Sequence, residues 1–113
     1  MSVTVIHAKD ATESSWDDFN DGGVKALNYQ FPEDDKSVVI AELTGHHGRY
    51  DSGKKPYYYY ILEGEGIFET DNEKIEVKPG DVVQFPPNTI YDYYPTSETP
   101  LKVVLFMQNM WKQ

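Results

Sequence analysis

The second half of the chain consists of short runs rich in aromatic and β-branched residues, each ended by glycine, proline, asparagine or aspartate. The runs are Tyr57–Glu63, Ile67–Thr70, Lys74–Val77 and Val82–Phe85. Glycine supplies positive φ angles, and proline fixes φ and cannot donate to a strand ladder, so both residues end strands. Short strands separated by such turns predict an antiparallel meander.

Further runs of similar composition lie on both sides of the meander. They are Val24–Phe31, Ser37–Thr44 and Leu101–Met107. Along Ser37–Thr44, apolar residues occupy both alternating sets of positions, which predicts a strand that is covered on both faces. The segment Thr89–Tyr94 leads into a turn at Pro95–Pro100. The pattern therefore predicts an all-β, antiparallel fold.

The N-terminal part of the chain follows a different pattern. Val3–Ala8 alternates in polarity and predicts an edge strand, whereas Lys9–Gly23 is polar and acidic. A serine-capped helical turn is expected over residues 14–18. We divide the chain into an N-terminal strand and arm, residues 1–23, and a barrel, residues 24–113. The arm is expected to pack against a partner subunit.

Composition and charge exclude several classes of function. The 113 residues are enough for one domain. The net charge of -9 argues against partners that are nucleic acids or anionic membranes, since both require a basic surface. No apolar run is long enough to span a membrane, and no signal-peptide layout is present. The absence of cysteine excludes disulfides and thiolate metal sites, and it fits a cytoplasmic location.

The meander resembles the core of the cupins, which are small jelly-roll β-barrels. The second motif of that family is Gly, five residues, Pro, one residue, Gly, two residues and a metal-binding His. Gly80 and Pro86 match its first two positions. Asn88 stands in place of the second glycine, and Tyr91 stands in place of the histidine. The resemblance implies a single-domain cupin jelly-roll whose metal site is degenerate.

The first motif of the family has lost its metal ligands in the same way. Gly64 serves as the glycine of the Leu-Glu-Gly turn, which places Tyr57 at the metal-binding glutamate. The His-x-His pair of the family would fall on Asp51 and Gly53, or one residue earlier on Tyr50 and Ser52. By the resemblance, no family ligand is present at any of these positions.

The histidines of this chain are not spaced to hold one ion. A cupin metal site needs three imidazoles and a carboxylate. His46 and His47 are adjacent, so they point to opposite sides of an extended segment, and His7 lies far away near the N-terminus. We therefore predict no metal and no other cofactor. The alternative is a non-standard site that combines His46 or His47 with Asp51 or Glu63.

Tyrosines at the vacated ligand positions predict a neutral pocket. If Tyr57 and Tyr91 take these positions, both phenols point into the barrel, and Tyr59 shares the face of Tyr57. Phenol hydroxyls and ring faces suit a polyol, a sugar or a small aromatic ligand. The candidate ligand-binding residues are Tyr57, Tyr59, Tyr91, Tyr50, Asp51 and Glu63. Alternatively, the same rings would plug a narrow eight-stranded barrel.

Three functions remain open at this point. The first is a metal-free cupin that binds a small, carbohydrate-like ligand. The second is a metal-independent sugar isomerase or epimerase that uses His46 or His47 as acid or base, because some metal-free cupins act on nucleotide-linked sugars. Only Arg49, Lys54 and Lys55 are available near these histidines to bind a diphosphate. The third is a plugged, non-catalytic barrel that acts in dimerisation or protein contact.

The remaining tyrosines predict an interface. Tyr58 and Tyr60 should face away from Tyr57 and Tyr59, and they are assigned with Tyr93 and Tyr94 to interface or surface packing. A two-fold dimer is the commonest way to cover such a sheet face. We therefore expect a homodimer.

Overall fold

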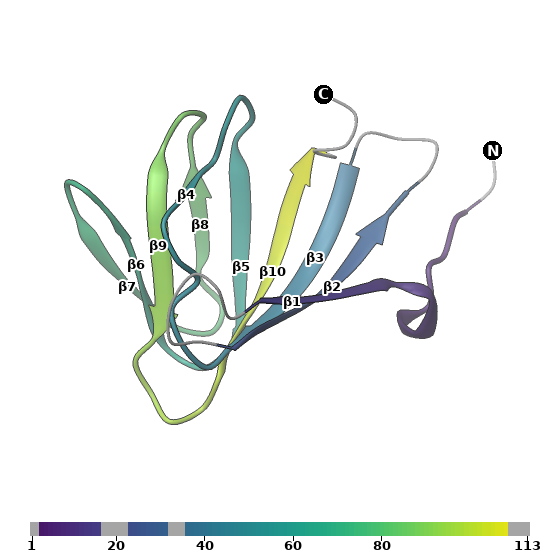
Figure 1. Ribbon diagram of the computed structural model, residues 1–113, viewed down its shortest axis with the longest axis horizontal. Coiled ribbons are helices and arrows are strands. Elements are labelled where there is room, and N and C mark those ends of the chain that lie inside the picture. The colour runs from purple at the N-terminus through teal and green to yellow at the C-terminus, as the bar shows by residue number, and fades with distance from the viewer. Residues whose placement is uncertain (1–2, 17–22, 32–35, 109–113) are drawn as a thin grey trace.

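The computed structural model describes residues 3–16, 23–31 and 36–108. Within these ranges the chain forms a short 3-10 helix at Ala8–Asp10 and two antiparallel sheets (Figure 1). The strands are β1 (Thr12–Trp16), β2 (Val24–Gln30), β3 (Lys36–Leu43), β4 (Tyr50–Asp51), β5 (Tyr57–Glu63), β6 (Gly66–Thr70), β7 (Lys74–Val77), β8 (Val82–Phe85), β9 (Ile90–Pro95) and β10 (Leu101–Gln108). No helix in the described ranges is long and apolar enough to cross a membrane.

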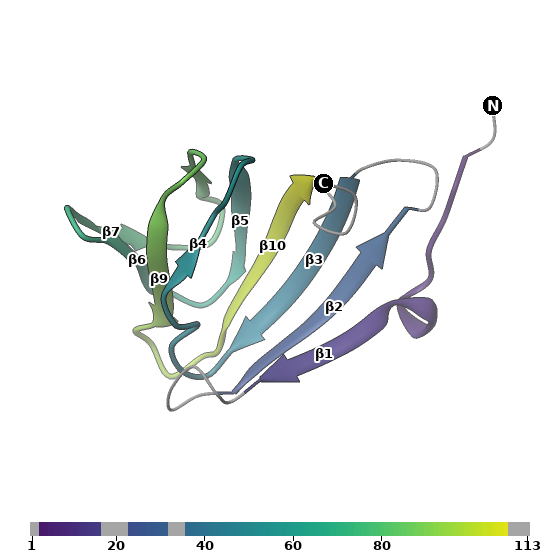
Figure 2. The same cartoon turned by 45° about the horizontal axis from the view of Figure 1, so that its top comes forward.

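The larger sheet has the strand order β1-β2-β3-β10-β5-β8, and the smaller sheet has the order β4-β9-β6-β7. Figure 2 shows that the smaller sheet lies against the β5 end of the larger sheet, while β1 and β2 extend away from it. All pairs are antiparallel, as the turn pattern predicts. The predicted bounds of β5, β7 and β8 are confirmed, and those of β2, β3, β6 and β10 differ by one residue.

The prediction for the N-terminal strand is wrong. Val3–Ala8 contains no strand, and the first strand is β1, which pairs with β2 in a register that places Thr12 opposite Asn28. Residues 14–16 belong to β1 rather than to the expected helical turn, whose last two residues lie outside the described ranges. The sequence of β1 is polar, so its ladder with β2 rather than an apolar face accounts for its extended shape.

Two residues at glycine positions of the family motifs, Gly64 and Asn88, lie in turns with positive φ angles. Gly64 adopts a φ of 79°, and a Cβ at this position would lie 2.4 Å from the carbonyl oxygen of Pro100. Only glycine therefore fits at the turn after β5. Asn88, which replaces a motif glycine, adopts a φ of 61°. Asparagine tolerates this left-handed conformation better than other side chains, so the turn is kept without glycine.

The core between the sheets has an aliphatic end and an aromatic end. Strand register places Leu101 of β10 opposite Leu43 of β3, and both side chains are fully buried. Further along β10, Leu105 lies opposite Tyr59 of β5. The aliphatic end is packed solid around Ile61, which is 0% exposed. The aromatic end is where the two sheets leave space.

Candidate functional site

A cavity of about 410 Å³ lies at the aromatic end of the core. Its aromatic wall consists of His47, Tyr50, Tyr57, Tyr59, Tyr91 and Tyr93. Its polar wall consists of Thr12, Ser14, Asn28 and Gln30. Apolar side chains of β2, β3 and β10 complete the lining. The volume falls in the range of small-molecule sites, so the tyrosines do not plug this end of the molecule.

The tyrosines of the aromatic wall are held by one another. Tyr59 and Tyr91 are each 1% exposed, and their hydroxyl oxygens lie 2.6 Å apart in a hydrogen bond. The ring of Tyr91 stacks on Phe85 at a centroid distance of 4.1 Å. Burial raises the pKa of the phenols of Tyr59, Tyr91 and Tyr93 well above the usual value. These hydroxyls are therefore neutral donors and acceptors at physiological pH.

The inward direction of Tyr57, Tyr59 and Tyr91 agrees with the alternation rule applied to the sequence. The same rule places Tyr58 and Tyr60 on the other face, where they are 39% and 38% exposed. Binding of a ligand by the inward tyrosines remains a prediction, since the alternation rule only determines which way they point.

His47 supplies the cavity with a buried, neutral base. It is 9% exposed, and its ring stacks on Tyr93 at a centroid distance of 4.8 Å. Nδ1 lies 2.9 Å from the carbonyl oxygen of Gly48, which can only accept, so Nδ1 carries the proton and Nε2 is the basic nitrogen. Burial lowers the pKa of His47 below 6.5, although the Gly48 hydrogen bond and the charge of Asp92 oppose the shift. His47 is therefore uncharged near pH 7.

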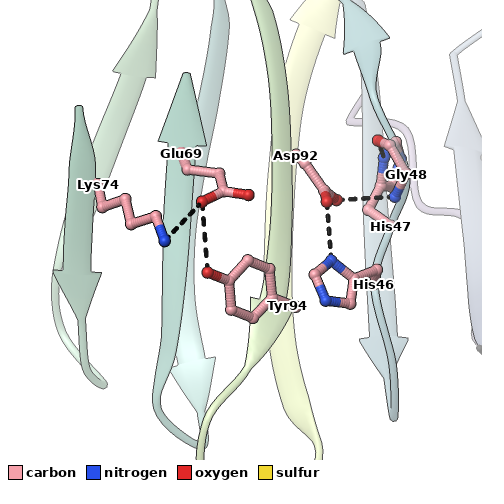
Figure 3. Close-up of polar contacts among 7 residues, drawn as sticks. All are labelled: His46, His47, Gly48, Glu69, Lys74, Asp92 and Tyr94. Atoms are coloured by element: carbon pink, nitrogen blue, oxygen red, sulfur yellow. Dashed lines mark hydrogen bonds and ion pairs between the residues drawn. The ribbon is translucent and has the colours of Figure 1, made fainter. Parts of the chain in front are cut away.

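His46 points to the opposite side of the loop, as adjacent residues in an extended segment should. Its side chain is 42% exposed, and Nδ1 lies 2.8 Å from Oδ2 of Asp92. The ring packs against Tyr94 at a centroid distance of 4.1 Å. Figure 3 shows His46, Asp92 and Tyr94 together on this face. Of the two candidate acid–base residues, only His47 lines the cavity.

Both carboxylates that were predicted at the site, Asp51 and Glu63, lie outside the cavity wall. Asp51 is exposed, and its Oδ1 accepts a hydrogen bond from the backbone nitrogen of Gly53 at 2.7 Å, which closes a local turn. Glu63 is exposed at the end of β5, next to the aliphatic end of the core. Tyr50, the remaining candidate, is half-buried and does line the cavity.

Tyr93 was assigned to interface or surface packing, and this prediction is wrong. It is 2% exposed, it lines the cavity, and it stacks on Phe68 at a centroid distance of 4.6 Å. The period-two rule that placed Tyr59 beside Tyr57 also places Tyr93 beside Tyr91. The signal was therefore present in the sequence.

The polar wall was missed altogether. The Nδ2 group of Asn28 donates to the carbonyl oxygen of Thr12 and to Oγ of Ser14, each at 3.1 Å. Asn28 and Gln30 are spaced by two residues in β2, so both reach the same face. Asn28 and Gln30 continue the alternating set of positions that begins with Val24 and Ala26, and this change from apolar to polar residues was the available signal.

The residues present do not fit a cupin metal. In the part of the chain that the structure describes, no three or more His, Cys, Asp or Glu side chains group to hold an ion. The cavity wall offers one imidazole, from His47, and phenols that burial keeps protonated. Such a donor set lacks the three imidazoles and the carboxylate that a cupin ion requires.

Comparisons with known proteins agree with this architecture. The chain is similar to a predicted oxalate decarboxylase of Thermotoga maritima, with a TM-score of 0.79 and 20% identity over 95% of this chain and 100% of the other. It is also similar to Pac13, a nucleoside dehydratase, with a TM-score of 0.76 and 20% identity over 95% of this chain and 82% of the other.

A sequence relative is an uncharacterised protein of Methanocaldococcus jannaschii, 40% identical over 67 residues. The match covers 59% of this chain and 51% of the relative, so the chain spans about half the length of that protein. The sequence model of the cupin domain family matches residues 44–107 of this chain. These residues contain β4 to β9, nearly all of β10 and the whole aromatic wall. The chain therefore belongs to the cupin family and has its antiparallel jelly-roll fold.

Proposed function

We propose that the chain binds a small, uncharged ligand that carries hydroxyl groups and a ring, such as a sugar or a nucleoside, in the cavity between the sheets. The observation that carries this proposal is the mixed aromatic and polar lining of the cavity. The rings and phenol hydroxyls of Tyr57, Tyr59 and Tyr91 come from β5 and β9, whereas Asn28 and Gln30 come from β2, which β3 and β10 separate from β5 in the larger sheet. Aromatic faces pack on sugar rings or bases, while amides and hydroxyls bind hydroxyl groups.

The lining also argues that the ligand is uncharged. Among the described residues that line the cavity, none is Asp, Glu, Lys or Arg, and the one histidine is neutral. A buried phosphate or carboxylate would therefore lack a counter-charge, which is costly in free energy. The basic residue Arg49 lies outside the wall and pairs with Asp71 at 3.0 Å on the surface. A nucleotide-linked sugar is thus less well supported than a neutral sugar or nucleoside.

Pac13 gives a first compound to test. A variant of Pac13 from Streptomyces with one tyrosine replaced by phenylalanine has a structure with uridine, and it covers 96% of this chain at a TM-score of 0.76. At 20% identity, the likeness concerns the fold. It supports uridine as a probe because a ligand of this class fits a barrel of this shape.

The test is a thermal-shift and calorimetric titration with uridine, free sugars and uridine 5′-monophosphate. A neutral ligand at a hundredfold excess over its Kd should stabilise the fold by about 2.7 kcal/mol. The monophosphate should bind more weakly than uridine, and Tyr91→Phe should weaken the binding of any neutral ligand. Tyr60→Phe, on the outer face, is the matched control and should not change the affinity. No shift with any neutral compound, or tighter binding of the monophosphate, would contradict the proposal.

A second candidate function, acid–base catalysis without a metal, is favoured by the state of His47. The His47 imidazole is buried and neutral with its proton on Nδ1, so Nε2 is the nitrogen that would remove a proton from a carbon next to a carbonyl group. The expected readout is exchange of one ligand C–H for C–D in deuterated water, followed by NMR. His47→Gln should stop the exchange, whereas His46→Gln should not, since His46 lies outside the cavity.

A further inference from the structure

We infer that Asp92 is a positioning residue for His47, and that its carboxylate fixes the loop that holds this imidazole in the cavity. The inference deepens the proposed function and rests on it where ligand affinity is concerned. Asp92 does not line the cavity, because β9 alternates and points Tyr91 and Tyr93 inward. Asp92 therefore acts from the opposite face of the sheet.

One carboxylate holds the residues on both sides of His47. Oδ1 of Asp92 accepts a hydrogen bond from the backbone nitrogen of Gly48 at 2.8 Å, and Oδ2 lies 2.8 Å from Nδ1 of His46. The backbone nitrogen of His47 donates to the carbonyl oxygen of Tyr93 at 2.8 Å. Figure 3 shows the carboxylate of Asp92 directed at the loop, with dashed lines to Gly48 and His46. The loop is thus tied to β9 at three consecutive residues.

The contact with Gly48 also reaches the imidazole itself. Gly48 has a φ of 97°, a left-handed conformation that favours glycine. The carbonyl oxygen of the same residue accepts the proton of His47 Nδ1. Because Asp92 holds the nitrogen of Gly48, it restrains the residue whose carbonyl sets the tautomer of His47. Loss of the carboxylate should therefore change the tautomer as well as the position of the ring.

Burial makes the carboxylate a stiff restraint. The side chain of Asp92 is 13% exposed, whereas that of His46 is 42% exposed. Both oxygens of Asp92 have partners in the loop, and hydrogen bonds to a partly buried charge are stronger than those between neutral groups. The packing of the His46 ring on Tyr94 adds a second contact on the same face.

Glu69 provides a matched control. It lies opposite Asp92 in the pairing of β6 with β9. Its carboxylate accepts from the hydroxyl of Tyr94 at 3.4 Å and pairs with Lys74 at 3.6 Å. These contacts do not involve the loop. Removal of its charge therefore changes the same face of the sheet and leaves the restraint on His47 in place.

The experiment compares Asp92→Ala, Asp92→Leu and Glu69→Gln in the full chain by two readouts. The first is the ¹⁵N spectrum of the His47 imidazole, which reports the tautomer without any ligand. Asp92→Ala should convert the single Nδ1–H tautomer to a mixture, whereas Glu69→Gln should leave the spectrum unchanged. The second is the Kd for uridine, which should rise in Asp92→Ala because the imidazole of His47 no longer keeps its place in the cavity wall.

The two readouts separate failure of this inference from failure of the proposed function. If uridine does not bind the wild-type chain, the tautomer still tests the role of Asp92. A folded Asp92→Ala variant whose His47 spectrum matches the wild type would overturn the inference. If that variant does not fold, Asp92→Leu decides. Leucine has a branched side chain of similar shape and offers no acceptor to Gly48 or His46, so a shifted His47 imidazole spectrum supports the role and an unchanged spectrum overturns it.

Discussion

The hydrogen bond between Tyr59 and Tyr91 offers a direct test of how dry the cavity wall is. Both side chains are 1% exposed, and the two oxygens lie 2.6 Å apart. Tyr59→Phe removes one hydroxyl and leaves that of Tyr91 buried without this partner. The penalty for such a group is about 1–3 kcal/mol of unfolding free energy. For a domain of this size, each 1 kcal/mol corresponds to about 4 °C in Tm.

The double variant Tyr59→Phe/Tyr91→Phe should cost less than the sum of the two single variants, because the second substitution removes a hydroxyl that has already lost its partner. The expected coupling is roughly 1–2 kcal/mol. Urea unfolding followed by circular dichroism gives the four free energies, with coincident transitions as the check on two-state behaviour. Tyr60→Phe, at 38% exposure, should stay within about 0.5 kcal/mol of the wild type.

One result would refute the reasoning. If each single variant stays within about 0.5 kcal/mol of the wild type and the pair shows no coupling, water in the cavity replaces the lost partner. The hydroxyls would then be hydrated, and burial would no longer raise their pKa values. A hydrated wall would also weaken the case for ring packing by an apolar ligand face.

Three further predictions concern other parts of the molecule. Because the pKa of His47 is lowered in the folded state, the unfolded state binds the proton more readily. The unfolding free energy should therefore fall as pH drops below about 6.5, by up to about 1.4 kcal/mol per pH unit, and His47→Gln should remove this slope in urea titrations. Gly64→Ala should lower the unfolding free energy more than Gly53→Ala. Both glycines have positive φ, but only a Cβ at Gly64 would lie within 4 Å of other backbone atoms. Thermal unfolding of both variants therefore separates the cost of this steric clash from the cost of backbone strain at positive φ. We also propose that the outer face of β5 and β10 forms a homodimer, since Tyr60 and Phe106 are 38% and 49% exposed there. Phe106→Glu should then yield a monomer in sedimentation, and a monomeric wild type would contradict this proposal.

Turn chemistry accounts for the part of the fold that the sequence predicts well. β5, β7 and β8 end at Glu63, Val77 and Phe85, each followed by residues whose backbone conformation is restricted or unusually free. Once these ends are known, the two-residue period determines which tyrosines share a face. The family resemblance placed Tyr57 and Tyr91 in the wall, this rule added Tyr59, and Tyr93 was missed because the rule was not extended along β9.

Long-range pairing accounts for what the sequence did not predict. β1 has a polar sequence with little periodicity, and its strand conformation depends on the ladder with β2. Likewise, the loop before Tyr50 contains glycines and charges that predict mobility, yet Asp92 and Tyr93 of a distant strand hold it at His46–Gly48. Contacts between residues more than forty positions apart leave no periodic signal in either segment.

The aromatic wall and the polar wall of the cavity come from different parts of the chain, and only one of these parts matches the cupin family model. The aromatic wall lies within residues 44–107, which match the cupin model, whereas Thr12, Ser14, Asn28 and Gln30 precede them. The orientation of the Asn28 amide is fixed, because its nitrogen donates to Thr12 and Ser14. Its oxygen is therefore the atom that can accept a hydrogen bond from a ligand. A ligand that spans the cavity must satisfy this fixed polar wall as well as the rings. Choice among ring-bearing ligands should thus depend on β1 and β2, so relatives that share only the matched residues would keep the aromatic wall and differ in what they bind.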